Sequence, residues 1–279
     1  MTLVEPSVDT VIPRLADAIN RQIGFRTADV MSKIASCLAT VESSDRSAYA
    51  QRLAISPPGD IAWTKFLERM LVHETYFFRH PAQIELLCDR VLPGLDAKRR
   101  QAGRGTLTAW TAGCSTGEET WTMALSAACA RGTTDGCEPV PLSVLGTDIS
   151  ETVLAAARNG TYTRLHALDS FRAIPAWAVR HFAGLSEGDV WSVPASLRRD
   201  VSFVRHNLLD PPPIAGADLV LCRNTLIYFD EAANRRAQAN LAAALPGGVL
   251  VLGPADTLRD PRGFEPIEAP AAIVYRKRA

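Results

Sequence analysis

The feature that most constrains the fold of this chain is a series of short apolar runs, at residues 107–112, 141–147, 201–204, 218–222 and 248–253. Ala-rich stretches with helical spacing separate these runs. Short runs that are apolar throughout are typical of parallel strands buried on both faces, and their alternation with helices indicates βα units. Near the end of the chain, FEPIEAP and AAIVYRK predict an antiparallel pair. We therefore expect an α/β fold built on a Rossmann-like, doubly wound sheet.

The first part of the chain has a different pattern. Apolar residues recur at helical spacing between residues 11 and 23 and between residues 30 and 41, which predicts amphipathic helices. We expect a small all-α N-terminal domain at 8–72, followed by an α/β domain at 73–279. The stretch 149–200 is too long for one crossover helix, and we expect it to contribute to a small β-hairpin subdomain inserted at about 184–202.

Composition excludes several classes of protein. The chain has 279 residues, of which 47% are hydrophobic, enough for a full enzymatic core. Its 30 basic and 30 acidic side chains cancel, so we expect neither nucleic acid nor an anionic membrane as partner. The 6 cysteines show no C-x-x-C spacing, which argues against a metal site or a disulfide framework. Without a targeting segment or an apolar run of membrane-spanning length, a soluble cytoplasmic protein is expected.

The stretch AGCSTGEETW follows the first predicted strand and resembles a nucleotide-binding glycine loop. Gly113 and Gly117 have the spacing G-x-x-x-G, which differs from the dinucleotide fingerprint G-x-G-x-x-G. Glu118 and Glu119 occupy the first helical turn, where they would repel a phosphate. Asp148 ends the next strand, the position of an acid that binds ribose hydroxyls. A ligand with adenosine and a positively charged amino-acid end fits this pattern, and S-adenosylmethionine is such a ligand.

A simpler interpretation of the same residues stays open. Glutamates in a first helical turn complement the helix dipole in many proteins, and Asp148 could cap the helix that follows it. The loop by itself does not decide between these interpretations.

Four segments together resemble the CheR-type chemoreceptor glutamate O-methyltransferases. HETYFFRHPAQIELL resembles the family's N-E-T-x-F-F-R segment, and WTAGCSTGEET resembles its S-A-G-C-S-T-G-E-E-P loop. GTDISETVLAAARNGTY resembles its A-T-D-I-D segment, and DLVLCRNTLIYFD its F-C-R-N-V-x-I-Y-F-D stretch. Their order and spacing also fit, so the resemblance covers roughly residues 8–279. It implies an S-adenosylmethionine-dependent methyltransferase domain, with S-adenosylhomocysteine as product.

The resemblance also implies roles for individual residues. It places cofactor contacts at His73, Thr75, Arg79, Gly113, Glu119, Asp148, Asn207, Leu208, Cys222, Arg223 and Asn224. Arg79 and Tyr228 would flank the transferring methyl group as the catalytic pair. An arginine can hold a carboxylate with two hydrogen bonds and a tyrosine hydroxyl can donate one, so we expect both to orient the acceptor.

Some of these residues also have purely structural interpretations. The aromatic run 76–78 is typical of core packing, and Cys222 at a strand end is typical of a small buried hydrophobe. Arg223 could simply pair with an acid such as Asp218 or Asp230.

The function that the resemblance implies is methyl esterification of glutamates on the cytoplasmic helices of methyl-accepting chemoreceptors. Two departures qualify this expectation. The second helix offers only Lys33 where the family carries several arginines, which weakens steering toward an acidic target, and His73 stands at the family's asparagine. The connection before Trp191 is short, which predicts an enzyme independent of a receptor pentapeptide.

Two alternative functions stay open. The chain could methylate carboxylates of a different signalling protein, or it could be a non-catalytic S-adenosylmethionine-binding module. The joint presence of Arg79, Asn224 and Tyr228 favours an enzyme, because binding alone would not need groups at the methyl end. A Rossmann dehydrogenase is disfavoured by the glycine spacing and the two acids of the loop.

Overall fold

The computed structural model describes residues 8–42, 45–57, 60–128, 139–164, 170–182 and 189–278. The chain separates into two compact units. The first comprises residues up to Val72 together with Leu226–Ala237, and the second comprises His73–Thr225 and Gln238–Ala279. No sequence pattern predicted that residues 226–237 belong with the helical part of the chain. The division into functional domains at 8–72 and 73–279 stays a prediction.

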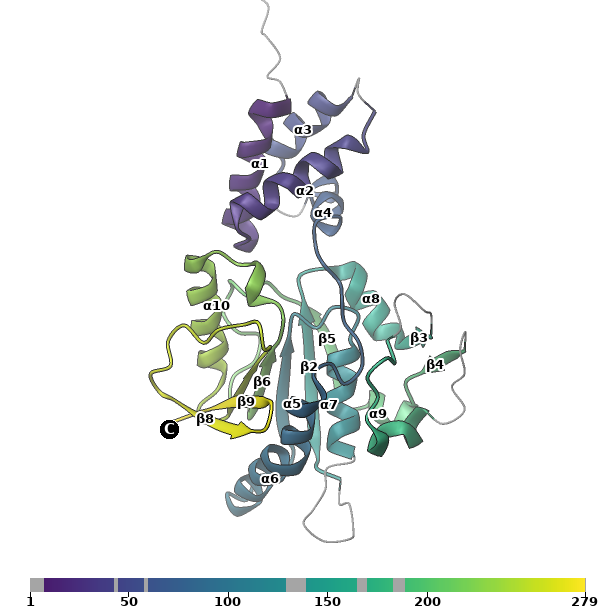
Figure 1. Ribbon diagram of the computed structural model, residues 1–279, viewed down its shortest axis with the longest axis vertical. Helices are drawn as coiled ribbons and strands as arrows, with labels where there is room; N and C mark the ends of the chain where they lie inside the picture. The colour runs from purple at the N-terminus through teal and green to yellow at the C-terminus, as the bar shows by residue number, and fades with distance from the viewer. Residues whose placement is uncertain are drawn as a thin grey trace, which may run out of the picture. The chain divides into compact units, whose positions relative to one another are not determined.

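The first unit is helical, as the periodicity predicted (Figure 1). Its helices are α1 (Val8–Ile23), α2 (Thr27–Ala39), α3 (Arg46–Ile55) and α4 (Ile61–Glu68). Leu15 and Ile19 of α1 and Ile34 of α2 have no exposed surface, because the helical spacing turns them all to the inside.

The segment 226–237 completes this first unit. It contains a 3-10 turn, η3 (Leu226–Tyr228), and the start of α10 (Glu231–Ala244). Phe229 forms an isolated β-bridge with Phe25, and their ring centroids lie 5.8 Å apart. The backbone N–H of Asp230 donates to the Gly24 carbonyl at 2.8 Å.

The second unit is built on a seven-stranded sheet in the order β5-β2-β1-β6-β7-β9-β8. Its parallel strands are β1 (Leu107–Ala112), β2 (Leu142–Asp148), β5 (Val201–Arg205), β6 (Leu219–Cys222) and β7 (Val249–Leu252). The antiparallel strands β8 (Phe264–Ala269) and β9 (Ala272–Lys277) close it. These strands confirm the predicted apolar runs, the C-terminal pair and the α/β fold class.

Helices flank this sheet (Figure 1). A long helical segment precedes β1 and consists of α5 (Pro81–Leu86), a π-helical turn η1 (Leu87–Val91) and α6 (Leu92–Gln101). Further helices follow the strands, namely α7 (Glu118–Ala128), α8 (Glu151–Asn159) and the second half of α10. Among the described residues, no helix combines the length and the apolar character needed to cross a bilayer.

The small second sheet differs from the expected hairpin. Strand β4 (Val190–Ser192) pairs antiparallel with β3 (Thr161–Thr163), whereas residues 201–205 join the main sheet as β5. The 3-10 helix η2 (Ala176–Phe182) lies between β3 and β4 in sequence, and the short α9 (Ala195–Arg198) follows β4. The hairpin boundary at 184–202 was therefore wrong for its second strand. Residues 184–188, on which the pentapeptide prediction partly rests, lie outside the described residues, as do Cys129 and Cys137.

A cluster of aromatic rings joins the small sheet to the segment that precedes α5. The ring of Phe77 contacts Phe171 in a stacked arrangement at 5.4 Å, and it meets Tyr162 and Trp191 edge-on at 5.0 and 5.4 Å. Phe77 and Phe78 have no exposed surface, which confirms the core packing predicted for them. This cluster fixes the backbone immediately before Arg79.

Candidate active site

The strand order of the second unit identifies one edge of the sheet as the place for a ligand. From β1 the chain moves outward through β2 to β5, and it then returns to the other side of β1 for β6 and β7. Ligands of open α/β sheets bind at the carboxyl ends of the strands where the order reverses. Here that point lies between the ends of β1 and β6, at Gly113 and Arg223.

The glycine loop approaches the turn after β6 closely. Gly113 has a φ of +77°, and a Cβ atom there would lie 2.5 Å from Oγ1 of Thr225. The position accepts only glycine, both because of its left-handed backbone and because of this neighbour. The loop is therefore packed against the end of β6.

The backbone amides of this loop are largely bound within the protein. Gly113 and Cys114 both donate to the carbonyl of Thr147, at 2.8 and 2.9 Å, and Gly117 donates to the carbonyl of Cys114. Ser115 donates to the Asp148 carboxylate at 2.9 Å. A pyrophosphate site needs free N–H groups at this place. The loop is not built as one, which agrees with the interpretation of its glycine spacing.

Asp148 ends β2 and keeps capacity for a ligand. Its Oδ1 accepts from the Ser150 amide at 3.0 Å and its Oδ2 from the Ser115 amide. Burial raises the pKa of the carboxyl, while these amides and the charge of His73 oppose the rise. A carboxylate has about four acceptor positions, so Asp148 keeps capacity for a further hydrogen bond, such as one from a ribose hydroxyl. Asp148 thus holds the loop and still offers acceptors.

Both acids of the loop have partners in the protein. Glu118 is 3% exposed and accepts hydrogen bonds from the hydroxyls of Thr116 at 2.6 Å and Ser170 at 2.8 Å. Burial raises its pKa. Glu119 accepts from Arg223 Nη1 at 2.9 Å in a buried ion pair. This corrects the expectation that both acids face a cationic ligand, because Glu118 serves the loop itself and Arg223 balances the charge of Glu119.

Arg223 is fully engaged at the end of β6. Besides Glu119, its guanidinium donates from Nε to Gln83 at 3.1 Å and from Nη2 to the carbonyl of Arg79. The pairing alternatives for Arg223 were therefore wrong, since Asp218 pairs with Arg99 at 2.6 Å. Asp230, the other alternative, belongs to the first unit, where its carboxylate accepts from the Asn20 amide.

The segment before α5 carries three predicted residues, and the first of them contacts the glycine loop. The carbonyl of His73 accepts from the Ser115 hydroxyl at 3.1 Å, and Thr75 follows in the same irregular segment. Arg79 donates from Nη1 to the carbonyl of Glu74 at 2.8 Å. Its Nε is buried and has no hydrogen-bond partner among the described residues. An unsatisfied buried donor is costly, so a group that accepts from Arg79 Nε is expected at this place.

The remaining predicted residues of this unit lie at the ends of β5 and β6. Asn207 and Leu208 follow β5, whose last residue lies beside Asp148 in the sheet register, and Leu208 is buried. Cys222 is the fully buried last residue of β6, and burial raises the pKa of its thiol far above the ordinary value. Its side chain is a core residue, as its position predicted.

Three residues that the sequence did not single out also shape this place. The His80 ring lies 3.2 Å from the side-chain oxygen of Asn224, and Asp256 accepts from the amides of Asn224 at 2.6 Å and Gly253 at 3.0 Å. Gln83 ties Arg223 to the carbonyl of Leu252. Asp256 follows β7, so the carboxyl-end rule would have found it.

Four non-glycine residues at this edge have left-handed backbones. Their φ values lie between 51° and 57°, and they are Phe78, His80, Ser115 and Asn224. Such conformations cost about 1–2 kcal/mol per residue and persist only where the surroundings impose them. Their concentration on the segments that carry the predicted residues supports this edge as the candidate functional site.

Tyr228 belongs to the first unit. It ends η3, its ring centroid lies 5.7 Å from that of Phe25, and Lys33 Nζ lies 5.7 Å from the centre of the Tyr228 ring. Its backbone carbonyl accepts from the Arg26 amide at 3.1 Å.

Comparison with known proteins decides the family. Residues 73–273 match the family described as "CheR methyltransferase, SAM binding domain". The chain belongs to the CheR methyltransferases. S-adenosylmethionine is the cofactor of this domain, which confirms the predicted cofactor and the methyltransferase class.

Three relatives illustrate the range of this family. An uncharacterised 104.1 kDa protein of Rhodobacter capsulatus is 37% identical over 68% of this chain and 19% of its own length. The probable biofilm formation methyltransferase WspC of Pseudomonas aeruginosa is 33% identical over 84% of this chain and 53% of its own. Chemotaxis protein methyltransferase 1 of the same organism is 31% identical over 76% of each chain. The chain thus spans about half or less of the first two relatives.

Proposed function

We propose that this CheR-family chain methylates glutamate side chains of chemoreceptors, forming methyl esters, with S-adenosylmethionine as methyl donor. The observation that carries the proposal is the buried, unpartnered Nε of Arg79 at the switch point of the sheet. A carboxylate that accepts from this atom satisfies a donor that the protein leaves unmatched. When bound, S-adenosylmethionine supplies an electrophilic methyl group on a positively charged sulfur.

The acceptor needs orientation more than activation. A glutamate carboxyl has an ordinary pKa of about 4.3, so it is ionised at neutral pH and no general base is required. Arg79 is proposed to fix one carboxylate oxygen while the other faces the methyl group. Holding the reacting groups at attack distance in a place that excludes water can supply much of the rate.

The cofactor is proposed to lie along the carboxyl ends of β1, β2, β5 and β6. Asp148 would accept from the ribose hydroxyls with its remaining lone pairs, and Asn207 and Leu208 would border the adenine. Gly113 would let the backbone approach the ligand. Asn224, with its backbone constrained by Asp256, is proposed to border the amino-acid end.

The other residues of the proposed site either position their neighbours or border the cofactor directly. Arg223 donates to the carbonyl of Arg79 and to Glu119, so we assign it to positioning both residues. His73 and Thr75 would contact the cofactor from the segment that leads to Arg79. Cys222 would contribute its backbone.

Tyr228 is proposed as the second catalytic residue. Its hydroxyl can donate a hydrogen bond to an acceptor carboxylate. The support for this role is its place in the stretch CRNTLIYFD, which follows the family pattern. A Tyr228→Phe variant that methylates at the wild-type rate would exclude it.

A second candidate substrate is a carboxylate on another signalling protein. Two observations favour it. Helix α2 carries Lys33 as its only basic side chain, and one relative is named for biofilm formation. A weakly charged face steers poorly toward an acidic receptor helix.

The test is transfer of labelled methyl from S-adenosylmethionine to receptor-bearing membranes, followed by mild alkali and a count of volatile methanol. Base-labile label that Arg79→Ala and Asp148→Ala abolish supports carboxyl methylation of a receptor. Base-labile label on soluble proteins alone favours the second candidate. Binding of S-adenosylhomocysteine with no transfer to any protein contradicts both and leaves a binding module.

A further inference from the structure

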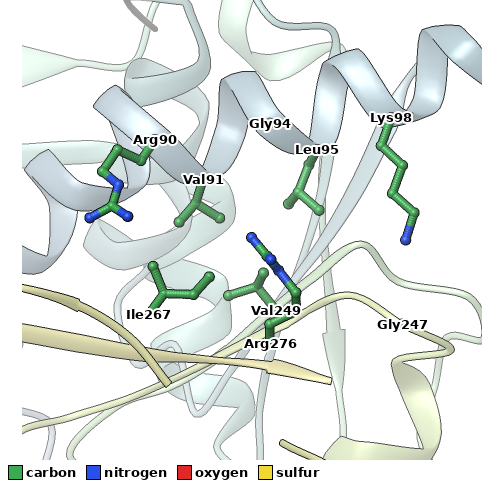
Figure 2. A pocket seen from close by; sticks show the side chains of 9 residues that line it. All are labelled: Arg90, Val91, Gly94, Leu95, Lys98, Gly247, Val249, Ile267 and Arg276. Carbon is green, nitrogen blue, oxygen red and sulfur yellow. The ribbon is translucent and has the colours of Figure 1, made fainter. Parts of the chain in front are cut away.

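A hollow of about 260 Å³ lies beside the helical segment that precedes β1 (Figure 2). Its walls come from η1 and α6 on one side and from β7, β8 and β9 on the other. Val249, the first residue of β7, lines it, whereas Leu252 ends the same strand near the candidate active site. The hollow therefore lies at the amino end of β7, opposite the edge that binds the cofactor.

Three cationic side chains line this hollow, namely Arg90, Lys98 and Arg276, and none of the described lining residues is acidic. In Figure 2 the guanidinium of Arg276 lies between the head groups of Arg90 and Lys98. Arg90 donates to the carbonyl of Glu268 at 3.0 Å, a neutral partner that leaves its charge unbalanced. Across the described residues, Lys98 and Arg276 form no ion pair.

Two acids close to Lys98 and Arg276 pair with other cations. Asp96, two residues before Lys98, pairs with Arg100 at 2.8 Å. Glu265, which faces Arg276 in the register of β8 and β9, pairs with Arg278 at 2.9 Å. Like charges gathered in one hollow repel each other, so an anion bound among the three cations would be stabilised by all of them.

The remaining lining is apolar. Val91, Leu95 and Ile267 present aliphatic side chains to the same space (Figure 2). Ligand pockets combine apolar walls with a few polar groups that fix orientation, and typical volumes are about 300–1,000 Å³. This hollow is slightly smaller, which restricts it to compact ligands.

Gly94 is one of the residues that line the hollow. It lies within α6, and a Cβ atom there would meet nothing within 4 Å. A glycine inside a helix costs about 0.5–1 kcal/mol relative to alanine, and neither packing nor a left-handed backbone explains this one. Its effect is to keep the wall of the hollow open.

We propose that this hollow binds a phosphorylated small molecule, with one or two phosphoryl groups on a body the size of a sugar or a nucleobase. The arginine guanidinium groups can hold phosphate oxygens with paired hydrogen bonds, and the Lys98 ammonium adds a point charge. The aliphatic walls cover the organic body. This binding does not depend on the proposed methyl transfer.

Calorimetric titration of the full chain tests the proposal. S-adenosylhomocysteine is present at saturation, so that the probes do not enter the cofactor site. The probes are inorganic pyrophosphate, ribose 5-phosphate and uridine diphosphate, with uridine as the uncharged comparison, all at one fixed ionic strength. We expect the phosphorylated probes to bind at submillimolar concentration and uridine not to bind.

Variants of the lining residues test whether the phosphorylated probes bind in the hollow. Arg276→Gln and Lys98→Gln should each weaken it about tenfold or more, since each removes one charged contact. Gly94→Leu should weaken ribose 5-phosphate and uridine diphosphate more than pyrophosphate, because it fills the space for the organic body. Arg262→Gln removes an arginine whose side chain is 89% exposed and should change nothing. No binding by any phosphorylated probe, or equal losses in Arg262→Gln and Arg276→Gln, overturns the proposal.

Discussion

The guanidinium of Arg223 and the carboxylate of Glu119 form an ion pair of 2.9 Å in which only 2% and 11% of the two side chains are exposed. The residues lie 104 positions apart, on the turn after β6 and in the first turn of α7. Burial raises the pKa of Glu119 and lowers the pKa of Arg223, and each partner opposes the other's shift. The pair joins the glycine loop to the strand beside it.

Removing one partner of this pair should therefore be severe. Glu119→Ala leaves the buried Arg223 charge uncompensated, and we expect a loss of about 3–5 kcal/mol in the free energy of unfolding, measured by urea denaturation. Glu231→Ala breaks an exposed pair with Arg235, whose side chains are 69% and 59% exposed, and should cost under about 1 kcal/mol. If Glu119→Ala and Glu231→Ala lost similar amounts of unfolding free energy, burial would not make the Arg223 pair more important for stability than an exposed pair.

Arg79 should matter for rate more than for stability. Arg79→Lys keeps a positive charge but removes the Nε donor that is proposed to fix the acceptor carboxylate, so we expect methyl transfer to fall about tenfold, and about 100-fold in Arg79→Ala. Urea denaturation should change little. Arg172 is the matched control, because its guanidinium lies 3.9 Å from the centre of the Tyr76 ring, which Arg79 also approaches at 5.5 Å. If Arg172→Lys transferred methyl as slowly as Arg79→Lys, the loss of rate would come from local packing and not from the proposed role of Arg79.

Alanine variants of two glycines distinguish the cost of a left-handed backbone from the cost of close packing. Gly103 has a φ of +67° and open space around a Cβ, whereas Gly113 has a φ of +77° and Thr225 only 2.5 Å from a Cβ. Gly103→Ala should cost about 1–2 kcal/mol in the free energy of unfolding, from the left-handed backbone alone. Gly113→Ala should cost about 1–3 kcal/mol more. Thr225→Ala should recover part of that excess, and equal costs at both glycines would refute the close approach.

The stability of the chain should fall in mild acid because of His80. Burial lowers its pKa and the charge of Arg223 lowers it further, while the Asn224 hydrogen bond opposes the shift. In the window below the ordinary histidine pKa of about 6.5, the unfolded chain binds more protons than the folded chain, so protonation favours unfolding. The free energy of unfolding should therefore drop as pH falls from about 7 through the folded-state pKa.

His80→Asn should flatten this dependence, since asparagine tolerates the left-handed backbone of position 80 without titrating. Burial lowers the pKa of His181 as well, so part of the fall should remain in His80→Asn. The raised pKa values of Asp148, Glu118 and Glu119 act in the opposite direction, because the folded chain then binds more protons at these carboxyls. Urea denaturation between pH 7 and about 5 measures how the free energy of unfolding depends on pH. An unchanged slope in His80→Asn would contradict the prediction.

The central strands β1, β6 and β7 could be predicted because they are buried on both faces, and that burial selects continuous apolar runs. The residues at strand ends were predicted for a related reason, since a parallel sheet brings the ends of separate strands together. Asp148 lies beside the loop of Gly113 as this rule requires. The prediction of the cofactor is confirmed. One reason given for it was wrong, because Glu119 pairs with Arg223 and does not face a cationic ligand.

Pairings between distant side chains could not be predicted. Glu118 is held by Ser170, 52 residues away, and no local pattern encodes such a contact. The same limit explains the wrong second strand of the hairpin, since the length of the connection 149–200 does not say that Trp191 pairs with Tyr162. The sequence pattern did not identify His80, because the position of its ring depends on a left-handed backbone.

The discontinuous first unit has a consequence for anyone who wishes to express parts of this chain. A fragment cut at Val72 would lack Phe229, which is buried and bridges Phe25. A fragment starting at His73 would carry residues 226–237 without the helices on which they fold. Recombinant truncations at that boundary should therefore be poorly soluble, whereas a helical fragment fused by a short linker to residues 226–237 retains its own contacts.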